Sequence, residues 1–447
     1  MTTRSLESVV VAPGDVLKVL GKHLLVDGFH LVVDLEKSKG SRVYDSSSGK
    51  WYLDFYTFFA SNPVGINHPR MMTKEFEAKL VRASRNKPAN SDVYTTEMAE
   101  FVETLSRLAM PGHLPHLFLI EGGALGIENA LKAAFDWKVR KNFRKGYTYE
   151  RGTSVIHFRQ AFHGRTGYTL SLTNTDPVKT DYYPKFCWPR IDNPKVRFPL
   201  EGDNLEAVKR AETLAVAQIE RAFLEKPDDI AAIIIEPIQG EGGDHHFRAE
   251  FFKELRRLAD ENDAMLIVDE VQAGVGLTGK MWAHEHYGIR PDMLCFGKKL
   301  QVCGVMASQR IDEVPDNVFA VSGRINSTWG GNLADMVRAT AYLEIIHEEN
   351  LVGNAAAMGD LLLAGLNRLQ AKYPHMISNS RGRGLMCAFD LATPELRNRL
   401  KGLGYEEGMI LLGCGPASIR FRPALNITRE EVEEGLEKIG RCLARLA

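Results

Sequence analysis

The sequence predicts an α/β fold in two parts: a large domain around a doubly wound, mostly parallel sheet, and a smaller α+β domain. Three observations carry this prediction. Short apolar runs alternate with longer helical patterns through the middle of the chain. These runs are apolar along nearly their whole length, which is typical of strands covered by helices on both faces. With 447 residues, the chain is also too long for one simple core.

Five apolar runs are expected to form the strands of the large sheet. They are residues 116–121, 154–159, 229–237, 264–270 and 292–297. Helical patterns follow the first and the third of these runs, at 127–141 and 247–262. The alternation of strands and helices favours a parallel sheet, and it places the large domain at residues 61–335.

The smaller domain is expected to contain the C-terminal part of the chain, residues 336–447. Its predicted elements are helices at 351–373 and 427–447 and strands at 381–391 and 418–425. Thr428 is expected to be the N-cap of the last helix. The N-terminal segment, residues 1–60, contains the alternating pattern of a hairpin at 43–55 and is expected to join this domain.

The composition is that of an ordinary soluble globular protein, with 44% hydrophobic and 25% charged residues. A formal net charge of −1 gives no indication of nucleic acid or an anionic membrane as a partner. We find no apolar run of the roughly 18 residues that a membrane span needs, and no secretory signal in the first ten residues. The six cysteines form no C-x-x-C pair, so we expect reduced thiols in a cytoplasmic protein.

Two short motifs are rejected because of their context. GVGLTGK at 274–280 has the glycine spacing of a nucleotide-binding loop. However, Met281 stands where a P-loop needs Ser or Thr, and the acidic residue of a dinucleotide fingerprint is missing. Asp244, His245 and His246 are consecutive, and adjacent histidines seldom bind the same metal. A surface loop without metal is therefore expected there.

The candidate site lies at the carboxyl ends of the predicted strands, where open α/β sheets bind their ligands. EGGALG at 121–126 offers backbone N–H groups to a phosphate. Phe162, Asp269 and Lys298 follow three other strands and supply an aromatic ring, a carboxylate and an amine. Together these groups indicate pyridoxal 5′-phosphate, whose ring needs stacking, a protonated nitrogen and a Schiff-base lysine. By themselves, the residues leave open whether that lysine is Lys298 or its neighbour Lys299.

Longer segments resemble a known family. VDEVQAGVGLTGKMWAHEHYGIRPDMLCFGKK at 268–299 is similar to the signature of class III (ω-amino acid) aminotransferases, which are fold-type I pyridoxal-phosphate enzymes. GGALGIENALK, FHGRTGYTLSLTN and EPIQGEGGD match the family's phosphate, ring-stacking and glutamate segments in the same order. The resemblance covers almost the whole chain. FGKKLQVCGV, NSTWGGN, RGRGLMCAF and RFRP further resemble the branch that acts on the ε-amino group of L-lysine.

The resemblance implies a role for each cofactor-binding residue. Lys298 matches the Schiff-base lysine, which makes Lys299 a bystander, and Asp269 matches the partner of the pyridinium nitrogen. The other implied cofactor contacts are Gly123 and Ala124 at the phosphate, Phe162 and His163 in the ring-stacking segment, Gln272 near the ring oxygen and Thr328. Thr328 matches a residue that reaches the phosphate of the neighbouring subunit, which implies a homodimer with shared active sites.

The resemblance also implies the substrate contacts. Arg165 and Arg420 match two arginines that hold substrate carboxylates, and Glu241 matches an acidic gate for Arg420. Asn326 is a further expected pocket residue. The implied reaction is a ping-pong transfer from L-lysine to 2-oxoglutarate, giving 2-aminoadipate 6-semialdehyde and L-glutamate, with Lys298 as base and acid.

Several alternatives are weighed against this reaction. Ornithine, acetylornithine and 4-aminobutyrate aminotransferases share the chemistry, and one methylene is worth only about 1–3 kcal/mol in an apolar pocket. Physical reasoning on the residues alone therefore does not decide between lysine and ornithine as the amino donor. A pyridoxal-phosphate aminomutase is disfavoured by the pair of Glu241 and Arg420, which suits two alternating substrates. A non-catalytic binding protein is disfavoured by the presence of both Lys298 and Asp269.

Overall fold

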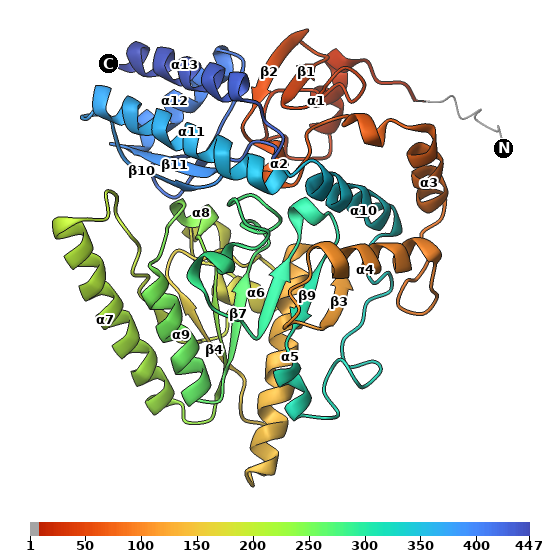
Figure 1. The fold of residues 1–447 in the computed structure, drawn as a ribbon, viewed down its shortest axis with the longest axis vertical. Helices are drawn as coiled ribbons and strands as arrows, with labels where there is room; N and C mark the ends of the chain where they lie inside the picture. Colours follow the sequence, from red (N-terminus) through yellow and green to blue (C-terminus); the bar gives the residue numbers. More distant parts are fainter. Residues whose placement is uncertain (1–8) are drawn as a thin grey trace.

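The centre of the fold is a seven-stranded sheet, seen in the computed structural model, which describes residues 9–447 (Figure 1). In spatial order its strands are β3 (His116–Ile120), β9 (Cys303–Ala307), β8 (Met293–Phe296), β7 (Met265–Asp269), β6 (Ile230–Ile235), β4 (Ser154–Phe158) and β5 (Arg190–Ile191). Only β9 runs in the direction opposite to the other six strands, so the predicted α/β fold with a mostly parallel sheet is confirmed. All five predicted strands are present, whereas β5 and β9 were not predicted.

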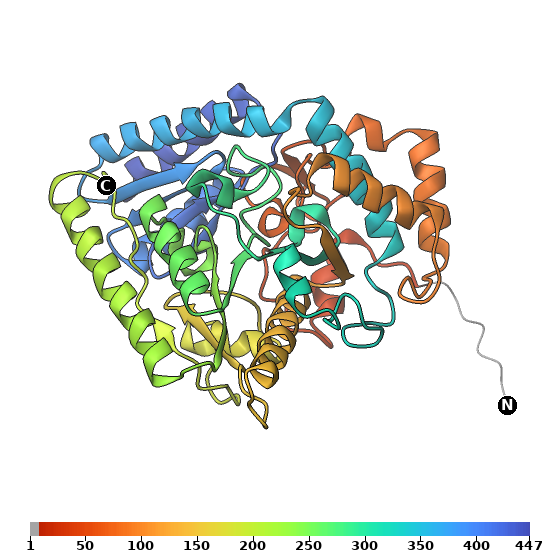
Figure 2. The same cartoon turned by 60° about the horizontal axis from the view of Figure 1, so that its bottom comes forward.

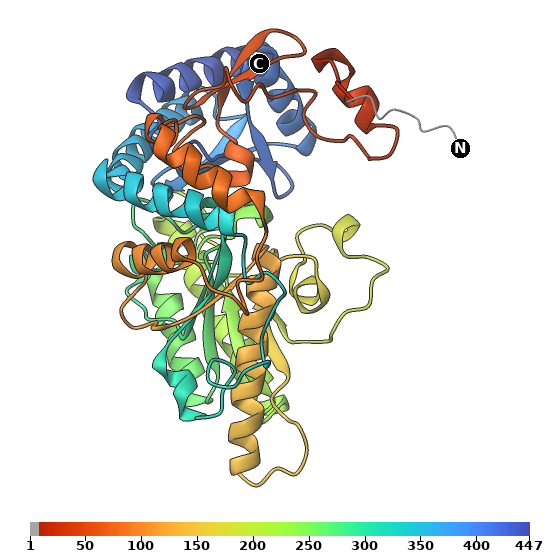
Figure 3. The ribbon, with the colours of Figure 1, turned by 90° about the vertical axis from the view of Figure 1, so that its right-hand side faces the viewer.

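Helices cover both faces of this sheet (Figures 2 and 3). α5 (Gly123–Arg144) packs on one face, and α9 (Ala249–Glu261) packs on the other, with α7 (Gly202–Glu225) beside α9. Side chains of β6 alternate between the two cores: Ile234 belongs to the α5 side, and its neighbours Ile233 and Ile235 belong to the α9 side. This double burial explains why the strand is apolar at every position.

A four-stranded antiparallel sheet forms the second part of the molecule. Its strands are β10 (Ile377–Arg383), β11 (Met386–Leu391), β14 (Ser418–Phe421) and β13 (Leu412–Cys414), and the nearby helices are α11 (Leu351–Lys372), α12 (Pro394–Glu406) and α13 (Arg429–Leu446). The predicted single strand at 381–391 is wrong. Gly384, with a φ of +51°, turns the chain and makes a hairpin there. Thr428 caps α13 as predicted, in a capping box with Glu431.

The predicted N-terminal hairpin is present as β1 (Arg42–Asp45) and β2 (Lys50–Asp54). β2 also pairs in parallel with β12 (Met409–Ile410), which brings the hairpin beside the C-terminal residues. The domain boundaries after residues 60 and 335 stay a prediction, and residues 1–8 of the N-terminal segment lie outside the described residues. Within residues 9–447, no helix has the length and apolar character that a membrane crossing requires.

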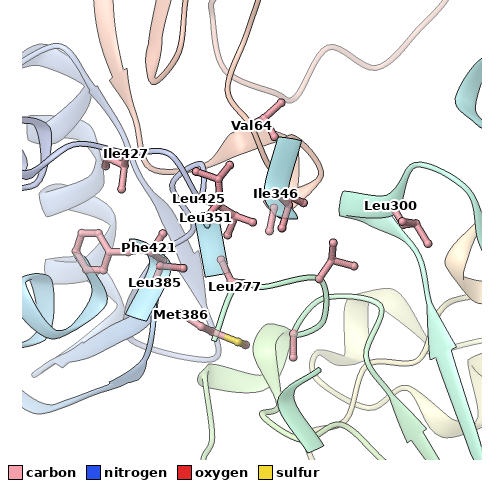
Figure 4. Packing of buried hydrophobic residues seen from close by; sticks show 14 of the residues in the cluster. Val64, Leu277, Leu300, Ile346, Leu351, Leu385, Met386, Phe421, Leu425 and Ile427 are labelled. Atoms are coloured by element: carbon pink, nitrogen blue, oxygen red, sulfur yellow. The ribbon is translucent and has the colours of Figure 1, made fainter. Parts of the chain in front are cut away.

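The two parts share one hydrophobic core where they meet (Figure 4). Leu277 and Leu300, from loops at the carboxyl ends of the large sheet, belong to the same buried cluster as Leu385, Phe421 and Leu425. α10 (Leu333–Glu348) leads from one part to the other and packs on α4 (Thr96–Leu108) and α3 (Lys74–Arg85). The strand ends that carry the candidate site are therefore held rigidly against the C-terminal sheet.

Candidate active site

Lys298 stands at the edge of the site, two residues after the end of β8. Its backbone has a φ of 48°, in the left-handed region that side chains other than glycine rarely adopt. Burial, followed by the charge of Arg420, lowers the pKa of the Lys298 amine to about 8. The residue is only partly buried, and with this pKa about a tenth of the amine is neutral at pH 7, far more than for an ordinary lysine.

Asp269 ends β7 and is held in place by two hydrogen bonds. Its Oδ1 accepts from the N–H of Val271 at 3.0 Å, and its Oδ2 lies 2.7 Å from Nδ1 of His163. His163 is itself buried, and its Nε2 has no hydrogen-bond partner within residues 9–447. Throughout that range, no group of three or more His, Cys, Asp or Glu side chains is arranged to hold a metal. The geometry therefore favours Asp269 as a hydrogen-bond partner of a ligand.

The start of α5 forms the candidate phosphate cradle. The helix begins at Gly123 without a side-chain cap, so the N–H groups of its first turn, including that of Ala124, are left for a ligand. A Cβ at Gly123 would lie 2.7 Å from a methyl group of Val271, so any other residue here would have to displace Val271. Glu128 of the same helix accepts hydrogen bonds from the Thr166 hydroxyl and the Thr169 N–H. These bonds join the cradle to the segment that carries Phe162 and His163.

Glu241 and Arg420 form the ion pair that the resemblance implies. Nη2 of Arg420 donates to Oε2 of Glu241 at 2.8 Å, and Nζ of Lys179 donates to Oε1 at 2.6 Å. Burial alone raises the pKa of Glu241, but Arg420 and Lys179 outweigh it, and the pKa lies below its ordinary value. Arg420 is only 2% exposed, and its Nε and Nη1 have no partner in the described part of the chain. Two donors of the guanidinium are thus left for another carboxylate.

Gln272 is held from both sides. Its Oε1 accepts from Nε and Nη2 of Arg422 at 3.1 and 3.0 Å, which leaves its NH₂ group as the free end. Its backbone carbonyl accepts from Nζ of Lys299 at 2.6 Å. Lys299 is therefore no solvated bystander: it is buried and supports the residue expected near the ring oxygen.

The surface loop predicted at residues 244–246 is wrong. Asp244 and Arg422 are each 1% exposed and form a bidentate ion pair, and His246 is buried as well. The Asp244 carboxylate can be buried because it is neutralised by Arg422, the residue directly after β14. A charged side chain without a partner at this depth would cost several kcal/mol.

Three predicted site residues do not join this cluster within the single chain. Arg165 is exposed and forms no hydrogen bond or ion pair with residues 9–447. Asn326 and Thr328 are also exposed, on the segment before α10. The backbone carbonyl of Thr328 accepts from the Ser91 hydroxyl at 3.3 Å, outside the cluster.

Sequence reasoning missed four residues of the site: Lys179, Glu236, Asp244 and Arg422. Glu236 follows β6 and is buried, which raises its pKa to about 7. It accepts from the N–H groups of Phe162 at 2.9 Å and Gly240 at 3.1 Å, and so joins two loops of the site. Its position directly after a buried strand was a usable signal, as was the RFRP motif for Arg422.

These residues fit the cofactor that the strand ends predict. An uncapped helix start suits a phosphate, a fixed buried carboxylate suits a pyridinium nitrogen, and a partly exposed amine of lowered pKa suits a covalent link. The fold and the site therefore define a fold-type I pyridoxal-phosphate enzyme.

The chain belongs to the class-III aminotransferases, whose family model matches residues 26–443. It is 51% identical to an L-lysine-epsilon aminotransferase of Mycobacterium tuberculosis and 49% identical to one of Amycolatopsis lactamdurans, each alignment covering 96% of both chains. It is 33% identical to the mitochondrial 4-aminobutyrate aminotransferase of Homo sapiens, over 89% of this chain and 82% of that one.

A solved structure of lysine aminotransferase from M. tuberculosis has a TM-score of 0.96 at 50% identity, covering 98% of this chain and 100% of that one. The resemblance found in the sequence is thus confirmed, and the chain is a pyridoxal-phosphate-dependent aminotransferase.

Proposed function

We propose that the protein transfers the ε-amino group of L-lysine to 2-oxoglutarate, giving 2-aminoadipate 6-semialdehyde and L-glutamate. The observation that carries this proposal is the pair of Glu241 and Arg420, 2.8 Å apart. Such a pair suits an enzyme with two amino donors, of which only one carries a carboxylate next to the reacting amine. The names of the relatives that match nearly the full chain, L-lysine-epsilon aminotransferases, support lysine as the donor.

The pair works as a switch between the two donors. The ε-carbon of lysine carries no carboxylate, so Glu241 stays on Arg420 and neutralises it while the alkyl chain lies in the site. Arg165 takes the distant α-carboxylate of lysine. Glutamate and 2-oxoglutarate bring a carboxylate that binds Arg420 in place of Glu241.

Proton transfer falls to Lys298. Pyridoxal phosphate, when bound, supplies an electron sink for the carbon next to the reacting nitrogen. Nζ of Lys298 would hold and move the proton at the reacting carbon, for which a pKa of about 8 is well matched. Asp269 keeps the ring nitrogen protonated, and His163 fixes the orientation of Asp269. Gln272 offers its free NH₂ group to the ring oxygen.

We further propose a cytoplasmic homodimer in which each subunit completes the partner's site. The exposed position of Thr328 supports this, together with the neighbouring exposed side chains of Trp329 and Tyr94. All six cysteines are unpaired, as a reducing compartment requires. Thr328→Ala is expected to weaken retention of the cofactor, and full activity of a demonstrably monomeric preparation would contradict the shared site.

Half-reactions test the choice of donor. The holoenzyme is mixed in turn with L-lysine, L-ornithine and 4-aminobutyrate, and the cofactor's absorbance is followed in a stopped-flow instrument. Only lysine is expected to convert the cofactor rapidly. Equal or faster conversion by ornithine or 4-aminobutyrate would overturn the substrate assignment and leave the aminotransferase class intact. Repeated turnover without 2-oxoglutarate, with an isomeric amino acid as the product, would indicate an aminomutase.

A further inference from the structure

Lys179 is a second cation on the Glu241 carboxylate. Its Nζ lies 2.6 Å from Oε1 of Glu241, and Nη2 of Arg420 lies 2.8 Å from Oε2. Each oxygen of one carboxylate is thus held by a different cation. The surroundings of the two cations differ, because the Lys179 side chain is 25% exposed and that of Arg420 is 2% exposed.

The position of Lys179 is fixed by its own segment. It ends the short 3₁₀ helix η3 (Pro177–Lys179), where Asp176 accepts from the N–H of Val178 at 3.1 Å. Upstream, the Asn174 side chain donates to the carbonyl of Phe158 at 3.0 Å and accepts from the N–H of Gln160 at 2.6 Å. The segment is therefore anchored to the end of β4, and the ammonium is held ready at the rim of the site.

Further contacts of Lys179 place it beside the cofactor region. Its Nζ lies 3.4 Å from the hydroxyl of Thr175 and 5.7 Å from the centroid of the Phe162 ring. Glu241 is the only carboxylate within 4 Å of this amine in the described part of the chain. Lys179 is thus oriented toward Glu241, whereas two buried nitrogens of Arg420 have no partner in the described part of the chain.

We propose that Lys179 is a positioning residue that retains the Glu241 carboxylate when a substrate carboxylate takes its place on Arg420. This inference rests on the proposed role of Glu241 as the switch. A carboxylate that left Arg420 with no other cation nearby would become an unpaired charge in a partly buried site. With Lys179 already bound to Oε1, Glu241 turns away from Arg420 and stays paired. Lys179 therefore favours the half of the cycle that uses glutamate and 2-oxoglutarate.

The test compares Lys179→Met with Lys179→Arg in the holoenzyme. For Lys179→Met, we expect kcat/KM of the 2-oxoglutarate half-reaction to fall about 10- to 100-fold, mainly through KM, since a Glu241 carboxylate displaced from Arg420 would have no other cation to bind. The lysine half-reaction is expected to change less than about twofold, because Glu241 keeps its bond to Arg420 throughout that half. Lys179→Arg should restore most of the loss. Lys185→Met, on the same segment but bonded only to backbone carbonyls, is the matched control.

The double variant with Glu241→Gln separates the possible outcomes. In that background, Lys179→Met should add no further loss, since an amide carries no charge to retain. A further loss of 2-oxoglutarate binding would show that Lys179 binds the substrate directly, which overturns the proposal. Equal loss in both half-reactions of the single variant would also overturn it. If Glu241→Gln alone affects neither half-reaction, the proposed role of Glu241 as a switch is wrong. If Glu241→Gln behaves as expected but Lys179→Met behaves as wild type, only the proposed role of Lys179 is wrong.

Discussion

The substitution Glu241→Gln removes the charge of the proposed switch and keeps its shape. In the wild-type protein, Oε2 of Glu241 lies 2.8 Å from Nη2 of the buried Arg420, whose other two nitrogens have no partner within residues 9–447. An amide still accepts a hydrogen bond there but does not neutralise the guanidinium. When the alkyl chain of lysine covers Arg420, water that would solvate the charge is excluded. The lysine half-reaction is therefore expected to slow.

The size of this effect follows from the burial of the pair. Removing one partner of a fully buried ion pair costs about 3–5 kcal/mol. The Glu241 side chain is 25% exposed, so solvent screening reduces the cost to about 2–3 kcal/mol. In kcat/KM for lysine this is a loss of roughly 30- to 160-fold. Glutamate brings its own carboxylate to Arg420 and no longer competes with Glu241, so its half-reaction should keep its rate or become faster.

Single-turnover absorbance with lysine and with glutamate measures the two halves separately. Glu254→Gln, on the exposed face of α9, controls for a carboxylate lost elsewhere. Equal slowing of both half-reactions, or no effect on either, would refute the reasoning, because a switch must act on one donor and spare the other.

Four further substitutions test the rest of the site. Lys298→Ala should abolish borohydride trapping of the cofactor and nearly all turnover, whereas Lys299→Ala should keep the covalent link; a cofactor-labelled peptide mapped to Lys299 would contradict this. Because the pKa of Lys298 is lowered to about 8 and only the neutral amine attacks, reattachment of cofactor to the apoenzyme should speed up with pH and level off above about 8. A plateau reached only above about pH 10 would show an unshifted lysine. Asp269→Asn should bind cofactor yet slow the proton transfer roughly 10²–10⁴-fold in single turnovers, and activity lost to a chelator and restored by a divalent ion would instead indicate a metal site. Asp244→Ala leaves Arg422 buried without its ion-pair partner and should lower the free energy of unfolding by about 3–5 kcal/mol in urea denaturation, so an unchanged midpoint would argue against this pair.

The parts of the site that follow directly from strands could be predicted from the sequence. β6 is apolar at every position, and β7 is apolar up to its last residue, Asp269, because helices cover both faces of the sheet; such runs are visible without any knowledge of contacts. The carboxyl ends of parallel strands lie on one edge, so a polar residue after each run, such as Asp269 or Lys298, is brought to the same place. For these residues, the local sequence pattern and the topology of the sheet are together sufficient to predict a place in the site.

The charged residues that arrive from distant segments could not be predicted in this way. Asp244 pairs with Arg422, 178 positions further along the chain, and Glu241 pairs with Lys179, 62 positions earlier. A charged residue in a loop has the same sequence pattern whether it is solvated or paired in the interior. That ambiguity is why Asp244 was expected at the surface and why Lys179 was not expected in the site at all.

The turn at residues 57–60 has a backbone conformation that contacts with other parts of the chain must stabilise. Its four consecutive residues, none of them glycine, have φ values from 42° to 64°, and each such residue costs roughly 1–2 kcal/mol. The buried carboxylate of Asp54 accepts from the N–H groups of Tyr56 and Thr57, and the Thr57 hydroxyl donates to the carbonyl of Arg422 at 2.6 Å. Gln301 donates both to the carbonyl of Ser61, just after the turn, and to that of Lys298. The bonds of Thr57 and Gln301 therefore tie the turn to Arg422, which holds Gln272, and to the backbone of Lys298. Backbone strain concentrates at functional sites, and local propensity does not predict this turn because two of its partners, Arg422 and Gln301, lie hundreds of residues away.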